Sequence, residues 1–133
     1  MAKRGNCIVI MLIALTINIQ AFYFPFGVST FFPISHEVLL NNPVKIKTKD
    51  AEWILKFTSS KTSKKPAREF YMGLARFELR LNNRSLILDQ TGAFKTNDGA
   101  GVLDKKQLND LVEFLRKHLK KPDGSPVSDR DYR

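Results

Sequence analysis

The chain has almost no cysteine, because Cys7 is the single one among its 133 residues. Cys7 lies in an apolar run near the N-terminus, so the rest of the chain cannot form an internal disulfide. Small extracellular domains of eukaryotes are often stapled by disulfides, and this lack therefore favours a bacterial cell-envelope protein. Internal repeats are also missing, and the length fits one small domain with a targeting segment and a tail.

Charged side chains are missing between Arg4 and Glu37. A basic N-terminus precedes an unbroken apolar run over residues 7–17, and a short polar region then ends at Ala21. This layout is typical of a secretory signal peptide that is cleaved after Ala21. The uncharged stretch is also long enough to cross a hydrocarbon core of about 30 Å, which would make residues 1–32 a transmembrane anchor with an aromatic flank. Both interpretations stay open.

The distribution of Lys and Arg sets the expected orientation of this segment. Lys3 and Arg4 precede it, and the next permanently charged cation is Lys45. The positive-inside rule then places the N-terminus in the cytoplasm. We expect a single-pass membrane protein with its C-terminal domain outside the cytoplasm, or a secreted or periplasmic protein if the chain is cleaved after Ala21. That location argues against a nucleic-acid partner.

Residues 33–121 predict a small α+β domain. Residues 33–43 predict a short helical turn, and three stretches predict strands: 44–48, where apolar and basic residues alternate, 51–58, which contains Trp53 and Phe57, and 70–81. In the last of these, the alternation places two sets of side chains on opposite sides, namely Phe77, Leu79 and Leu81 against Arg76, Glu78 and Arg80.

A hairpin follows this strand. Asn82 and Asn83 tolerate positive φ, and residues 85–89 resume as a return strand. Residues 92–96 predict a further short strand after a Gly turn, and residues 97–101 predict a loop. Strands joined in this local way need no crossover helix.

The C-terminal part of the domain predicts an amphipathic helix that packs across the sheet. Asp104 and Gln107 match a capping box. An apolar stripe at helical spacing follows, made of Leu108, Leu111, Val112, Leu115 and Leu119. Cations crowd the helix end, where the helix dipole favours them. The fold class expected is thus α+β: an N-terminal hydrophobic helix, a mainly antiparallel sheet and one C-terminal helix, with residues 122–133 as a disordered polar tail.

Positive charge is in excess, with 22 Lys and Arg against 13 Asp and Glu and a net charge of +9. Most of the excess lies in one region, formed by Lys45, Lys47, Lys49, Lys56, Lys61, Lys64, Lys65 and Arg68. Such a field attracts acidic proteins, anionic lipid headgroups or nucleic acid. The alternative is a solvated lysine-rich face that only keeps the protein soluble.

Signatures of catalysis and metal binding are missing from the sequence. No G-x-S-x-G motif occurs, and His36 and His118 have no partner at metal-ligand spacing. Three carboxylates, Asp89, Asp98 and Asp104, could meet near the start of the C-terminal helix, although turn and cap roles account for all three. Asn83 begins a glycosylation sequon. Trp53 and Phe57 in a lysine-rich region could stack on bases, although such aromatics usually belong to a core.

We therefore expect a non-catalytic, exported or membrane-anchored protein that docks an acidic partner or anionic lipid through its basic region. No cofactor and no metal is expected. One alternative is an accessory subunit of a membrane complex, in which the apolar segment packs against partner helices. The other is a small ligand-binding or hydrolytic domain that uses the loops from Asp98 to Asp104.

Overall fold

A computed structural model describes residues 17–26, 36–59 and 74–127 of the chain. Its elements in chain order are β1 (Ile19–Tyr23), α2 (His36–Leu40), β2 (Pro43–Val44), α3 (Thr48–Ser59), β3 (Ala75–Leu81), β4 (Arg84–Asp89), β5 (Ala93–Thr96), β6 (Gly99–Val102) and α4 (Lys105–His118). The six strands form one sheet in the order β2-β1-β3-β4-β5-β6, and every neighbouring pair is antiparallel.

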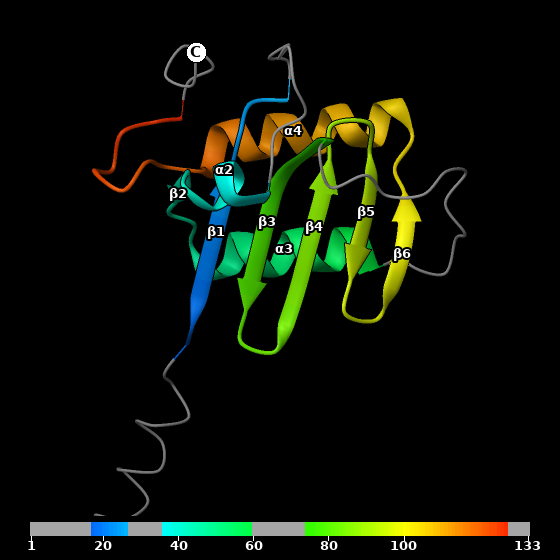
Figure 1. The fold of residues 1–133 in the computed structure, drawn as a ribbon, viewed down its shortest axis with the longest axis horizontal. Coiled ribbons are helices and arrows are strands. Elements are labelled where there is room, and N and C mark those ends of the chain that lie inside the picture. The colour runs from blue at the N-terminus through cyan, green and yellow to red at the C-terminus, as the bar shows by residue number, and fades with distance from the viewer. Residues whose placement is uncertain (1–16, 27–35, 60–73, 128–133) are drawn as a thin grey trace, which may run out of the picture.

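Helices cover the sheet unequally. Helices α3 and α4 lie side by side on one face, while the short α2 lies on the other (Figure 1). Leu111 and Leu115 of α4 and Ile54 of α3 pack with the core side chains of the first face. Leu39 of α2 packs in a separate cluster with Phe24 and Ala75. The sheet is antiparallel and the fold is roughly α+β, but the predicted fold class was wrong in its N-terminal hydrophobic helix and in its order of helices.

The largest correction concerns the N-terminal hydrophobic helix. Residues 19–23 are strand β1, which lies between β2 and β3 in the sheet. Ala21 pairs with Val44 on one side and with Leu79 on the other, and it is 3% exposed. Burial alternates along β1, but the strand is short and directly follows an apolar run, which hides the alternation in the sequence. The cleavage site predicted after Ala21 would therefore divide a strand of the sheet.

The predicted membrane location is corrected by the same finding. Within residues 17–26, 36–59 and 74–127, no helix is long and apolar enough to cross a membrane. The anchor predicted over residues 1–32 includes β1, while residues 1–16 and 27–32 lie outside the described residues. The assignments as a membrane, signal-bearing or cell-envelope protein, and the side of the membrane derived from them, thus lose their basis.

Residues 51–58 were predicted to be a strand but belong to helix α3. The side chains that α3 buries recur at helical spacing: Asp50, Ala51, Ile54, Leu55 and Thr58. Aromatic residues between them gave the appearance of a continuous apolar strand. Helix α3 lies in the connection between β2 and β3, which run parallel because both are antiparallel to β1. The expectation that only hairpins join the strands was therefore wrong.

The middle of the chain follows its predictions more closely. Strands β3 and β4 form the expected hairpin, and Asn82 in its turn has φ 55°. Gly92 enters the turn before β5 with φ 99°, where a Cβ would lie 2.8 Å from the Leu103 carbonyl oxygen. That close approach requires glycine. Part of the loop predicted over residues 97–101 instead belongs to β6, which spans residues 99–102 and pairs with β5.

The two faces of β3 carry the two predicted sets of side chains. Phe77, Leu79 and Leu81 are buried on the face covered by α3 and α4. On the other face Glu78 accepts a hydrogen bond from His36 at 2.6 Å and pairs with Arg80 at 2.5 Å.

Arg76 lies on this second face at a β-bulge and is 2% exposed. Its guanidinium donates to the Gln90 side chain at 2.6 Å and lies over the Phe24 ring. Burial lowers the pKa of Arg76, and the charge of Asp89 acts in the opposite direction.

The C-terminal helix was predicted correctly. The Asp104 side chain caps α4 by accepting a hydrogen bond from the Gln107 backbone N–H. The Gln107 side-chain oxygen in turn accepts from the Asp104 backbone N–H, which completes the capping box. Leu111, Val112, Leu115 and Leu119 are buried, as the stripe predicted. At the start of the predicted tail, residues 121–125 form a hydrogen-bonded turn, while residues 128–133 lie outside the described residues.

Candidate functional site

The predicted basic residues fall into two groups and an undescribed remainder. Lys45 and Lys47 lie between β2 and α3, and Lys49 and Lys56 lie on α3. All four are exposed. The remaining four, Lys61, Lys64, Lys65 and Arg68, lie outside the described residues.

Two main-chain hydrogen bonds bring the end of α4 to the first group. The Lys45 backbone N–H donates to the Lys120 carbonyl at 2.6 Å, and the Lys120 N–H donates to the Lys45 carbonyl at 3.0 Å. This antiparallel bridge places Lys117 and Lys120 beside Lys45 and Lys47. The cations at the end of the C-terminal helix, which were expected to interact with the helix dipole, thus lie beside the predicted basic region.

These residues surround a concavity of about 360 Å³, which we call the basic pocket. Its lining consists of Lys45, Ile46, Lys47, Asp50, Lys117, His118, Lys120 and Gly124. Four lysines therefore face a single carboxylate in the lining. None of the four has an ion pair with another described residue.

Asp50 and His118 contact one another in the lining of the basic pocket. The His118 Nδ1 lies 3.4 Å from the Asp50 carboxylate, whose side chain is 6% exposed against 32% for His118. Asp50 lies in the first turn of α3, where a negative charge is favoured by the helix dipole. Because Nδ1 faces Asp50, Nε2 is the ring nitrogen that stays available to a ligand.

A turn after α4 completes the edge of the basic pocket at Gly124. The Asp123 carboxylate accepts hydrogen bonds from the Ser125 hydroxyl at 2.6 Å and from the Ser125 backbone N–H at 2.9 Å. These bonds lower the pKa of Asp123, and the charge of Lys121 acts in the same direction. The carboxylate is thereby tied to its own turn rather than to the lysines of the pocket.

An aromatic ladder runs from the basic pocket across α3 and α4. His118 packs on Phe114 at a centroid distance of 4.2 Å, and Phe114 stacks on Trp53 at 4.1 Å and 19°. Phe57 also stacks on Trp53, at a centroid distance of 5.1 Å and an interplanar angle of 20°. These four rings, Phe57, Trp53, Phe114 and His118, form the aromatic ladder. Trp53 is nevertheless 40% exposed.

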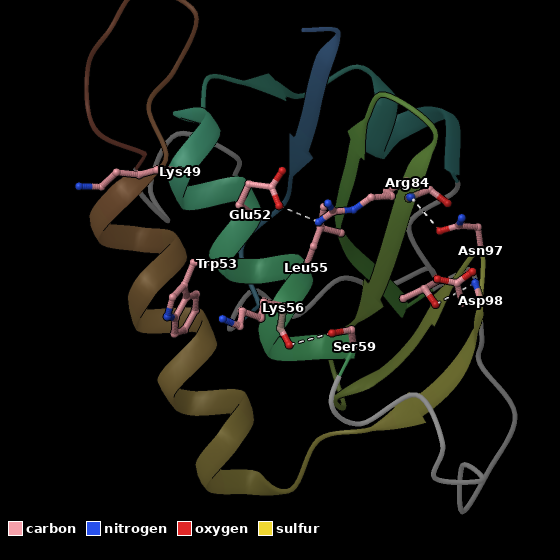
Figure 2. A pocket seen from close by; sticks show the side chains of 11 residues that line it. Lys49, Glu52, Trp53, Leu55, Lys56, Ser59, Arg84, Asn97 and Asp98 are labelled. Atoms are coloured by element: carbon pink, nitrogen blue, oxygen red, sulfur yellow. Dashed lines mark hydrogen bonds and ion pairs between the residues drawn. The ribbon is translucent and has the colours of Figure 1, made fainter.

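A second hollow lies on the other side of α3, against the hairpin turns (Figure 2). It has a volume of about 460 Å³ and includes Lys49, Trp53 and Lys56 in its lining. Across the hollow, Glu52 pairs with Arg84 at 2.9 Å. In this hollow a carboxylate and a cation form an ion pair, whereas the four lysines of the basic pocket have no ion pair with a described residue.

The three carboxylates considered for acid–base work have separate surroundings. Asp89 is fully buried and accepts from the Thr91 hydroxyl, the Thr91 N–H and the Ala93 N–H. Asp104 caps α4, and Asp98 lines the hollow in Figure 2. The described lining of that hollow includes neither Asp89 nor Asp104.

The other candidate residues, His36 and Asn83, do not line either hollow. His36 contacts Glu78, and Asn83 of the sequon is exposed in the turn between β3 and β4. Among the residues that the structure describes, no group of three His, Cys, Asp or Glu side chains could hold a metal ion.

Sequence reasoning missed Asp50, Lys117 and Lys120 as members of the site. The sequence shows no local signal for their association, because the Lys45–Lys120 bridge joins distant segments. Comparison of the chain with protein-family models, with curated proteins and with solved structures found no significant match.

Proposed function

We propose that this protein is a non-catalytic binding protein that docks an acidic segment of a protein partner on its basic pocket. The observation that carries the proposal is the Lys45–Lys120 bridge, since it gathers lysines from two distant segments around one concavity. A main-chain bridge fixes the positions of these residues while their ammonium groups remain available to a ligand.

The charge balance of the surface supports this proposal. Six exposed or half-exposed lysines lie on or beside α3 and the end of α4, and none has an ion pair with a described residue: Lys45, Lys47, Lys49, Lys56, Lys117 and Lys120. Like charges held close together repel one another, and an acidic partner relieves that repulsion. The association would be fast and would weaken with salt.

The composition of the lining supports binding rather than group transfer. The described residues that line the basic pocket include no hydroxyl or thiol side chain that could act as a nucleophile beside His118. The Asp50 carboxylate lies 3.4 Å from Nδ1 of His118. The ammonium groups of the four lysines then supply charge-assisted hydrogen bonds to a bound carboxylate.

A fluorescently labelled glutamate-rich peptide tests the proposal through its fluorescence anisotropy with the full chain. We expect binding that weakens steeply when salt rises from about 0.05 M to about 0.5 M, because screening shortens the range of the lysine charges. The double variant Lys45→Glu/Lys120→Glu should bind at least about tenfold more weakly. Its fold should persist, because the bridge uses backbone atoms only.

The matched control is Lys105→Glu/Lys106→Glu, which makes the same charge change at two exposed positions at the opposite end of α4. This control should keep nearly all of the affinity. An equal loss in both double variants would show that net charge, rather than the basic pocket, attracts the peptide. Tighter binding to anionic lipid vesicles than to the peptide would also reject the proposal.

A further inference from the structure

The aromatic ladder and the basic pocket share His118, which lines the pocket and packs on Phe114. An apolar strip of the surface is therefore continuous with the charged concavity. The strip runs between α3 and α4 and includes Trp53 at its exposed part. Resting on the proposed function, we infer that the partner segment carries an apolar side chain that seats on Trp53, flanked by carboxylates that meet the lysines.

The charges around Trp53 fit this kind of segment. Lys49 and Lys56 lie about one helical turn before and after Trp53, and Figure 2 shows the three residues following one another along α3. Both lysines are exposed and lack ion pairs with described residues. A partner segment with acidic residues on both sides of an apolar one therefore matches the sequence of charges on α3.

The exposure of Trp53 fits an anchor position. Tryptophan has a large apolar surface, and at protein interfaces it is among the residues whose truncation costs the most affinity. Here 40% of it remains exposed although two rings already stack against it. Its position is thus fixed before the partner arrives, which reduces the entropy lost on binding.

A protein partner fits this surface better than single-stranded nucleic acid does. Nucleic-acid sites of that class offer a free aromatic face on which a base can stack. Phe57 and Phe114 already occupy stacking surface of the Trp53 indole.

Trp53 is the chain's single tryptophan, so its fluorescence reports directly on the ladder. Three peptides without tryptophan should be titrated into the full chain. The first has leucine between glutamates at the spacing of Lys49, Trp53 and Lys56, the second has serine in place of leucine, and the third keeps leucine but has glutamine in place of glutamate. We expect the first to bind and shift the emission to the blue, and the second to bind about tenfold more weakly. The third should show no measurable binding.

Variants then assign the effect to Trp53, with anisotropy of labelled peptides as the readout. Trp53→Ala should weaken the leucine peptide to the affinity of the serine peptide and leave the serine peptide unchanged. Val38→Ala is the matched control, since Val38 is similarly exposed at 41% but lies on α2. It should change neither affinity. If Trp53→Ala does not fold, the comparison of the three peptides on the wild-type chain still decides the question.

The outcomes separate this inference from the proposed function. Equal affinities for the leucine and serine peptides, both reduced by Lys45→Glu/Lys120→Glu, would reject the anchor and keep the acidic docking site. Absence of salt-dependent binding for both peptides would reject both proposals. Tighter binding of a single-stranded oligonucleotide, with quenching of Trp53, would replace the peptide with nucleic acid as the ligand.

Discussion

The two faces of the sheet bury their side chains by different means. Toward α3 and α4, strands β3 and β4 place apolar side chains such as Leu79 and Leu88 in a continuous core. Toward α2, strand β3 places Arg76 and Glu78, which are also buried but are hydrogen-bonded or ion-paired. Apolar packing depends on volume, while a buried polar network depends on each partner being present. The two faces should therefore respond to different kinds of substitution.

The largest effect is expected on the apolar face. Leu79 is fully buried, and its strand position pairs with Ala21 and Leu86 in the neighbouring strands. Leu79→Ala should lower the free energy of unfolding by about 2–5 kcal/mol, because it removes buried methyl groups and leaves a cavity. Urea denaturation followed by circular dichroism measures this change.

Leu79→Met is the matched control, because it keeps the volume of the side chain. Its cost should stay below about 1.5 kcal/mol. Similar costs for Leu79→Ala and Leu79→Met would contradict a face that is stabilised by packing. A cost of Leu79→Ala below about 1 kcal/mol would show that α3 and α4 do not cover this strand tightly.

The polar face should show a smaller loss that depends on pairing. Glu78→Ala removes the acceptor of His36 and the ion-pair partner of Arg80, and should cost about 1–3 kcal/mol. The double-mutant cycle with His36→Ala measures the coupling. Because 37% of the His36 side chain is exposed, we expect a coupling of only about 0.5 kcal/mol.

One outcome of the double-mutant cycle would contradict the expected coupling between His36 and Glu78. If the two single losses add within about 0.3 kcal/mol, the His36–Glu78 hydrogen bond contributes nothing measurable and the polar face is held by other contacts. A loss above that of Leu79→Ala would reverse the comparison between the faces. It would indicate that buried charge, and not packing, dominates the stability of the sheet.

The sequence predicted the parts of the fold in which a pattern of one period was visible. Glu78 and its neighbours alternate cleanly, and Asp104 with Gln107 forms a local capping motif that needs no distant contact. Strand β1 could not be recognised, because its short alternation directly follows an apolar run that fits a signal peptide or an anchor. Helix α3 could have been recognised from Ala51, Ile54, Leu55 and Thr58, had the helical spacing been weighed above the aromatic content.

The candidate site was predictable only in part. Lys45 and Lys47 stand out in the sequence as local positive charge, and the structure places both in the basic pocket. Lys120 enters the pocket through a main-chain bridge to a distant segment, which has no sequence signature. Stacking of Trp53 on bases was a prediction from the sequence, but its stacking on Phe114 depends on how α3 and α4 lie side by side, which the sequence does not show.

The smallest effect is expected in the turn between β3 and β4, which helps to set which side chains point to each face of the sheet. A shift of one residue in the β3–β4 register would move each buried side chain to the opposite face. Asn82 lies in this turn with φ 55°, and its side-chain oxygen accepts from the Asn18 backbone N–H at 3.1 Å. Asn82→Ala should cost about 1 kcal/mol, because a Cβ without a compensating polar group disfavours left-handed backbone.

Asn82→Gly separates the backbone effect from the hydrogen bond, because glycine adopts positive φ without strain. The Asn18 N–H is exposed and can bond to water, so Asn82→Gly should change the free energy of unfolding by no more than a few tenths of a kcal/mol. An equal loss for alanine and glycine would assign the role of Asn82 to its side chain. Thermal unfolding of both variants together with Leu79→Ala tests whether the stability lost at the buried Leu79 exceeds the stability lost at the Asn82 turn.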